Sequence, residues 1–140
     1  MNPYNAYRRS EEPPGWARMD LLLALYDKAL ERLDKAAAAL TAGDGNAAIP
    51  LIAKTQLIVV ELASGVRLDV DEERGTNMIR LYEYVGNELR TPSEVGIANA
   101  RAVLSTLREG FEAVRDEANH LERTGSLSAA SNLRMVQATA

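Results

Sequence analysis

The stretch MDLLLALYDKALERLDKAAAAL, residues 19–40, decides the fold that this chain of 140 residues is expected to adopt. Its charged residues, among them Asp27, Lys28 and Asp34, fall on one side of a helix drawn through it. This spacing predicts an amphipathic helix with one apolar seam, a line of apolar side chains along the face that packs into the core. The seam follows steps of four and three residues through Leu22, Tyr26, Ala29, Leu33, Ala36 and Leu40.

A second helix is predicted over residues 47–66, after Gly43 and Gly45 have turned the chain. We expect Pro50 to lie in its first turn, because a proline farther inside would remove a hydrogen bond and clash with the preceding turn. Its seam contains Ala48, Ile52, Thr55, Val59, Leu62 and Val66.

Two more helices follow. The third is expected to begin near Asp71 and to end before Pro92. Its seam contains Met78, Tyr82, Val85 and Leu89. Ser93 is the predicted N-cap of the fourth helix, which Gly125 should end. The fourth seam is the longest and contains Ile97, Ala100, Leu104, Leu107, Phe111, Val114, Ala118 and Leu121.

Short connections between these segments predict that neighbouring helices run antiparallel. The expected fold is therefore all-α, an antiparallel up-down-up-down four-helix bundle over residues 16–125. Residues 1–15 are expected to form an extended N-terminal segment, because Pro3 and the Pro13-Pro14-Gly15 stretch oppose a regular helix. Residues 126–140 are expected to be a mobile or short-helical tail.

Composition excludes several classes of protein. Hydrophobic residues make up 46% of the chain and charged residues 26%, which is typical of a globular domain. No apolar run is long enough for a membrane span and no signal peptide is evident, so we expect a cytoplasmic protein that does not insert into a membrane. The net charge of −4 argues against a nucleic-acid partner, and the absence of cysteine excludes disulfides and thiolate metal sites.

Catalytic and metal-binding patterns are almost absent. Glu117 and His120 form the one Glu-x-x-His match, whereas a di-iron bundle needs two such motifs and two further glutamates. The seam residues Ala118 and Leu121 would also turn this pair away from the core. We therefore expect no cofactor, no metal and no enzymatic activity. A metal-binding enzyme that uses Glu117 and His120 stays an alternative, which the metal content of the purified protein would test.

The second helix has more apolar surface than a bundle core requires. Its apolar arc spans roughly 220°, where packing on one side needs little over 100°. Beyond the seam lie Ile49, Ala53, Leu57 and Val60 on one flank and Leu51 and Ile58 on the other. Leu21 and Leu25 add apolar surface at the edge of the first seam. Either this helix is simply buried, by loops or in a homodimer, or it forms a groove for an amphipathic segment of another protein.

Four stretches together resemble the flagellar secretion chaperone family FliS. NPYNAY, residues 2–7, resembles its N-terminal Asn-Pro-Tyr-x-x-Tyr signature, and LLLALYDKAL, residues 21–30, is similar to its Leu-Tyr-Asp-Gly-Ala-Leu stretch. AKTQLIVVEL, residues 53–62, and IRLYEYVGNEL, residues 79–89, are similar to the stretches of its second and third helices. The chain departs from the family at Lys28, which replaces a glycine, at Gly86-Asn87, where a basic pair is usual, and at Phe111, where many members have tryptophan.

The resemblance implies a cytoplasmic export chaperone. Members of this family bind the disordered C-terminal segment of flagellin, prevent its premature polymerisation and aid its delivery to the flagellar type III export gate. The partners implied are therefore flagellin and a component of the export gate. The alternative is a generic helical adaptor that binds another amphipathic segment. Sequence alone leaves open whether the protein is a monomer or a homodimer.

The resemblance also implies roles for particular residues. The N-terminal segment would cover the client surface when flagellin is absent, with Tyr4 and Tyr7 as its apolar contacts, and Tyr7 would also engage the export gate. Tyr26 and Tyr82 lie on seams and are predicted to be core, whereas Tyr84 lies off the seam. Gln56 is placed where a client backbone would need a polar partner. The predicted partner-binding residues are Tyr4, Tyr7, Leu21, Leu25, Ile49, Ala53, Gln56, Leu57, Val60 and Tyr84.

Overall fold

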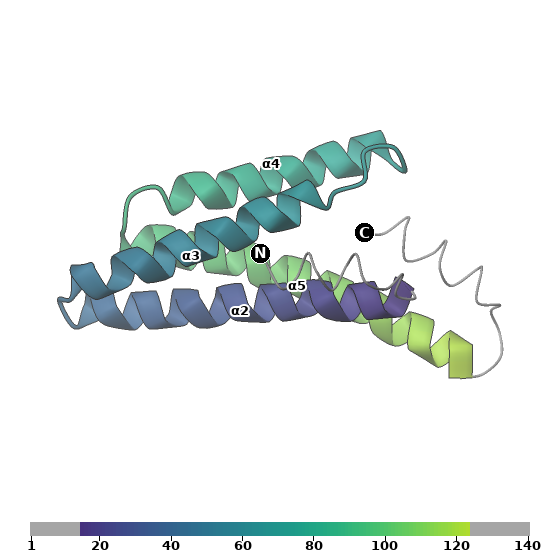
Figure 1. The fold of residues 1–140 in the computed structure, drawn as a ribbon, viewed down its shortest axis with the longest axis horizontal. Helices are drawn as coiled ribbons and strands as arrows, with labels where there is room; N and C mark the ends of the chain where they lie inside the picture. The colour runs from purple at the N-terminus through teal and green to yellow at the C-terminus, as the bar shows by residue number, and fades with distance from the viewer. Residues whose placement is uncertain (1–14, 124–140) are drawn as a thin grey trace, which may run out of the picture.

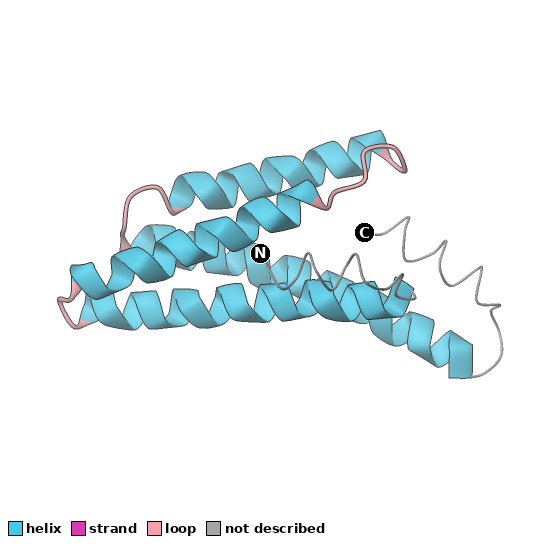
Figure 2. Cartoon of the chain, in the orientation of Figure 1, coloured by secondary structure: helices cyan, strands magenta, loops and turns pink. Residues whose placement is uncertain are grey.

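The computed structural model describes residues 15–123, which form four helices (Figure 1). These are α2 (Gly15–Thr41), α3 (Gly45–Ser64), α4 (Glu72–Glu88) and α5 (Glu94–Arg123). Figure 2 shows that the described part of the chain contains helices and connections but no strand. The prediction of an all-α bundle is confirmed. The expected N-terminal segment up to residue 14 and the tail from residue 124 lie outside the described residues.

Capping residues explain where three of the helices begin. The Asp44 carboxylate accepts a hydrogen bond from the backbone N–H of Ala47 at 3.1 Å, and the Asp71 carboxylate accepts one from Arg74 at 3.0 Å. The Ser93 hydroxyl accepts a hydrogen bond from the N–H of Gly96 at 2.9 Å, which confirms Ser93 as the N-cap of α5. These side chains satisfy backbone donors that a helix cannot pair internally.

The predicted position of Pro50 is wrong. Because α3 already begins at Gly45, Pro50 lies inside the helix, in its second turn. The α2–α3 connection turns at Gly43, whose φ of 79° favours glycine, and Asp44 then caps the new helix two residues earlier than expected. Pro50 has no N–H to donate to the carbonyl of Asn46, which belongs to an exposed residue near the helix end.

The start of α2 also differs from the expectation. The helix begins at Gly15, four residues before Met19, so Gly15 does not belong to an extended segment. Met19 and Leu23 are both buried in the core although neither was counted in the predicted seam, whereas Leu22, which was counted, is only partly buried. Met19 and Leu23 lie beside Tyr26 on the inner face of α2, because residues three, four and seven apart share one face.

A ladder of polar contacts joins α2 to α5. Arg115 pairs with Asp20, Arg108 with Asp27, and Arg101 with Asp34. The Thr41 hydroxyl donates to Glu94 at the end of the same series. Each step moves seven residues toward the end of α2 and seven residues toward the start of α5.

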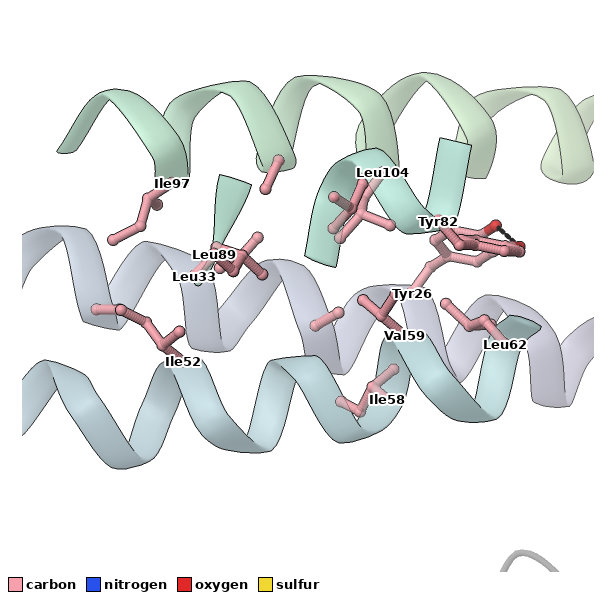
Figure 3. Close-up of a cluster of buried hydrophobic side chains, with 14 of the residues drawn as sticks. Tyr26, Leu33, Ile52, Ile58, Val59, Leu62, Tyr82, Leu89, Ile97 and Leu104 are labelled. Carbon is pink, nitrogen blue, oxygen red and sulfur yellow. Dashed lines mark hydrogen bonds between the residues drawn. The ribbon is translucent and has the colours of Figure 1, made fainter. Parts of the chain in front are cut away.

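The four helices enclose one apolar core. Helix α2 packs on α3 and α5, and α4 packs on the same two helices, so α2 and α4 stand diagonally opposite each other. Figure 3 shows the buried side chains, which come from all four helices. Tyr26 and Tyr82 are both buried, which confirms the prediction that they are core residues. The Tyr26 ring also packs on Phe111, with ring centroids 5.8 Å apart.

Candidate functional site

The side of α3 that points away from the core is apolar and open. Leu57 is 70% exposed, Val60 65% and Ile49 53%. Ala53 lies between them and is also exposed. Steps of four, four and three residues place all four side chains on one stripe along the helix. We call this stripe, formed by Ile49, Ala53, Leu57 and Val60, the outer face of α3.

The opposite flank of α3 does not contribute to this open surface. Ile58 is only 8% exposed and belongs to the core, and Leu51 is partly buried against the same core. These two residues therefore complete the packing of α3. The apolar surplus seen in the sequence divides into a buried flank and an open one.

The inner face of α3 is part of the bundle core. Ile52, Val59 and Leu62 are buried there among residues of the other helices. By length and composition α3 would also be able to cross a membrane, but this is weak evidence because core helices of soluble proteins pass the same test. The core packing of α3 accounts for its inner face and leaves the outer face unexplained.

Gln56 marks the side of α3 that faces α4. Its amide nitrogen donates a hydrogen bond to the carbonyl oxygen of Leu89, at the C-terminal end of α4, at 3.3 Å. Gln56 lies next to Leu57 in the chain and, by helical spacing, close to Ile49 and Val60 around the helix. Gln56, which was predicted to bond the backbone of a client, therefore already donates a hydrogen bond to a backbone carbonyl of its own chain.

The two predicted residues of α2 lie elsewhere. Leu21 and Leu25 are both half-buried, and Leu25 packs against the core. They occupy the flank of α2 away from the ladder that joins α2 to α5, so they face the α3 side. They therefore do not belong to the outer face of α3.

Tyr84 belongs to a third region. It is 41% exposed on α4, and its pKa is raised by desolvation and, to a smaller extent, by a hydrogen bond with Glu88. The backbone carbonyl of Glu88, at the end of α4, lies against Gly96 of α5. Leu81, one turn before Tyr84 and also exposed, was missed by the sequence analysis because it follows no seam.

The predicted partner-binding residues therefore do not form one continuous surface. The described ones divide between the outer face of α3, the side of α2 that faces α3, and the exposed surface of α4. Tyr4 and Tyr7 lie outside the described residues. Leu68 and Val70, in the connection between α3 and α4, are further exposed apolar residues that the seams did not indicate.

The described residues hold little that resembles a catalytic or metal centre. Glu117 and His120 are both exposed on α5. No group of three or more histidine, cysteine, aspartate or glutamate side chains between residues 15 and 123 is placed to hold a metal ion. The feature of this structure that most needs an explanation is a long, solvent-exposed apolar stripe on a well-packed bundle.

A long exposed apolar stripe on a packed helical bundle is the kind of surface to which amphipathic segments of other proteins bind. The family model described as "Flagellar protein FliS" matches residues 1–118, and the chain belongs to this family. FliS proteins are flagellar export chaperones and not a family of enzymes. No curated protein matches the chain. No solved structure matches it either.

Proposed function

We propose that this protein is the cytoplasmic export chaperone of flagellin. It binds the disordered C-terminal segment of flagellin, prevents premature polymerisation and aids delivery of flagellin to the flagellar type III export gate. Membership of the FliS family supports the chaperone role. The observation that carries the proposal for this chain is the outer face of α3, where Leu57 and Val60 are mostly exposed.

The physical chemistry of a disordered client supports a long surface as its binding site. A segment that folds on binding loses conformational entropy, and it must bury extended apolar surface to compensate for that loss. From Ile49 to Val60 the outer face of α3 runs along three helical turns, roughly 16 Å. An amphipathic helix of the client with apolar residues at three- and four-residue spacing would fit along it.

The other predicted residues would serve a client that continues past α3. Leu21 and Leu25 on α2 keep part of their surface open, and Tyr84 is open on α4. A client that wraps the bundle would reach these regions in turn, as disordered partners commonly do. Gln56 would then exchange its bond to the Leu89 carbonyl for one to the client backbone.

The N-terminal segment is proposed to cover the client surface in the absence of flagellin. Tyr4 and Tyr7 have apolar rings that suit the exposed leucine and valine side chains, and their hydroxyl groups can remain in water. Because α2 begins at Gly15, removal of residues 1–14 leaves all four described helices complete. Such a deletion should tighten client binding if the segment competes with the client. A generic adaptor would bind its partner equally well with and without these residues.

The proposal includes the arrangement of the helices. We infer the antiparallel up-down-up-down topology from the descending contacts between α2 and α5 and from the short connections between successive helices. In this arrangement the outer face of α3 points away from α2 and α5, so a client would reach it without opening the bundle.

Isothermal titration calorimetry with the C-terminal segment of flagellin from the same organism tests the proposal. We expect binding with a large negative heat-capacity change, the sign of apolar burial coupled to folding. Leu57→Glu should abolish binding at micromolar concentrations. Val95→Glu is the matched control, because Val95 is 71% exposed but lies at the start of α5. If no variant binds flagellin, or if both substitutions weaken binding equally, this function or this site is wrong.

A further inference from the structure

We propose that the C-terminal tail, residues 124–140, folds back on the bundle and covers the exposed apolar residues of the α3–α4 connection. In this arrangement residues 129–140 form a further helix, which runs antiparallel to the last turns of α5. The residues that it covers are Leu68 and Val70. The inference concerns contacts within one chain and does not depend on binding of flagellin.

The α3–α4 connection is folded against the bundle but leaves apolar side chains open. The side chain of Leu68 lies on α4, where its Cδ2 atom is 2.8 Å from the position that a Cβ of Gly75 would occupy. Leu68 is nevertheless 46% exposed, and Val70 is 41% exposed. The backbone N–H of Val70 donates a hydrogen bond to the carbonyl of Arg67, which closes the turn that carries both residues. A segment that covers this turn would remove its apolar surface from water.

The tail leaves the bundle at the same end as this connection. Figure 1 shows the end of α5, the start of α2 and the α3–α4 connection at one end of the bundle. At the other end, Gly96 of α5 lies against Glu88 of α4. With the antiparallel topology inferred above, α4 returns from there to Glu72, whereas α5 continues to Arg123. Helix α5 therefore extends about eleven residues, or roughly 16 Å, past the first turn of α4.

The length of the tail fits the distance that it must cover. Gly125 is the predicted end of α5, and the residues from there to Ser128 would form a short connection of the kind that joins antiparallel helices. A helix over residues 129–140 then spans roughly 16 Å, given a rise of about 1.5 Å per residue. Its far end would lie level with the start of α4, next to Leu68 and Val70.

The sequence of the tail has the spacing of an amphipathic helix. Steps of four, three and four residues place four apolar side chains on one face, which we call the apolar line of the tail. The apolar line consists of Ala129, Leu133, Val136 and Ala140. Ser131 and Ala138 fall on the opposite face. Leu133 would pack on the last turns of α5, and Val136 would reach the connection.

Charge and position favour the connection as the site of docking. Residues 65–74, which include the connection, contain four acidic residues and two arginines. Glu72 and Glu73 are exposed, and neither takes part in an ion pair of the described residues. The tail contains Arg134 and no acidic residue, so it brings no negative charge to this end. The outer face of α3 is a poorer match, because α3 stands diagonally opposite α5.

Cysteine cross-linking of the full chain tests the proposal, because the sequence contains no cysteine of its own. Mild oxidation of Val70→Cys/Val136→Cys should form an intramolecular disulfide, which requires the two Cα atoms to lie within about 7 Å. Val70→Cys/Ala138→Cys is the matched control. It should react about tenfold more slowly, since Ala138 lies on the opposite face of the tail helix. Val95→Cys/Val136→Cys should not react, because Val95 is exposed at the other end of the bundle.

A second comparison tests the apolar line itself. Added to the Val70→Cys/Val136→Cys variant, Leu133→Glu should slow disulfide formation about tenfold, because the line loses a leucine and gains a charge. Ser131→Glu adds the same charge on the opposite face and should leave the rate unchanged. Equal effects of these two substitutions would overturn the proposal.

Other outcomes of the cross-linking would also overturn it. Equal rates for the Val136 and Ala138 variants would show that the tail does not present one face to the bundle. Faster reaction of Val136→Cys with Val60→Cys than with Val70→Cys would place the tail on the outer face of α3. Covalent dimers in place of the intramolecular product would assign the surface of Leu68 and Val70 to a second copy of the chain.

Discussion

The hydroxyl oxygens of Tyr26 and Tyr82 lie 2.5 Å apart in the middle of the bundle and share a hydrogen bond (Figure 3). This bond joins α2 to α4, the two helices that stand diagonally opposite each other. Both rings are buried, so each hydroxyl depends on the other for a partner. The hydrogen-bonded pair fixes how α2 and α4, which do not pack directly on each other, are positioned along the bundle axis.

Replacing Tyr82 with phenylalanine should destabilise the protein by about 1–3 kcal/mol, because the Tyr26 hydroxyl would be left buried without a partner. The double variant Tyr26→Phe/Tyr82→Phe should lose less than the sum of the two single variants, since it leaves no orphaned group. Urea denaturation of the four proteins would measure this coupling. Additive losses would contradict the view that each hydroxyl serves the other.

Alkaline pH should unfold the protein through the same pair. Burial raises the pKa of both Tyr26 and Tyr82 above the ordinary value near 10, and for Tyr26 the neighbouring Tyr82 raises it further. The unfolded chain therefore releases these protons more readily than the folded one. The stability contributed by the neutral pair is complete below about pH 10 and is lost as the pH rises above it. Thermal unfolding between neutral pH and pH 11 should show this loss, and the double phenylalanine variant should show less of it.

Gly96 should tolerate no side chain. A Cβ at this position would lie 2.3 Å from the carbonyl oxygen of Glu88, where α5 passes the end of α4. Gly96→Ala should therefore destabilise the bundle by about 1–3 kcal/mol. Gly110, on the same helix, has open space around its Cβ position, and Gly110→Ala should stabilise by about 0.5–1 kcal/mol because alanine is the better helix former. Thermal denaturation measures both changes. A lower melting temperature for Gly96→Ala and a higher one for Gly110→Ala would establish the close approach of Gly96 to the Glu88 carbonyl.

Helical spacing was sufficient to predict the fold class and most of the core. The seams through Leu33, Val59, Val85 and Leu104 are buried as expected, because residues three and four apart must share a helix face. The errors concern helix ends and the start of the α2 seam, which is buried at Leu23 and only partly at Leu22. Pro50 was placed too near the start of α3 because the cap at Asp44 and the turn at Gly43 act before the first seam residue, where periodicity gives no signal.

The candidate site was harder to predict, because periodicity gives the width of an apolar arc but not the neighbours of each flank. Ile58 and Leu57 are adjacent in the sequence and equally apolar, yet one is buried against the core and the other is open. The bond from Gln56 to the Leu89 carbonyl shows which flank meets α4, and only the folded structure reveals it. For the same reason, sequence alone did not separate Tyr84 from the outer face of α3.

The ladder between α2 and α5 should contribute modestly and should depend on salt. Asp27→Asn removes one partner of Arg108, which also pairs with Glu112. We expect a loss of about 0.2–1 kcal/mol at low ionic strength and a smaller loss in 1 M salt, since the Asp27 carboxylate is exposed. Glu117→Gln on α5 is the control, because Glu117 is exposed and forms no ion pair with the described residues. Equal effects of the two substitutions would show that net charge, and not the ladder, is responsible.

The division of α3 into a core face and an outer face should separate stability from binding. Leu62 is buried and Leu57 is open, although both are leucines of the same helix. Leu62→Ala should reduce the free energy of unfolding by about 2–5 kcal/mol, whereas Leu57→Ala should change it by no more than about 0.5 kcal/mol. Leu57→Ala should nevertheless weaken binding of the flagellin segment. Urea denaturation of the two variants would test the predicted effects on stability, and calorimetry with the flagellin segment would test the predicted effect on binding. A large loss of stability in Leu57→Ala would mean that the outer face is covered by part of its own chain, and the client would then have to displace that cover.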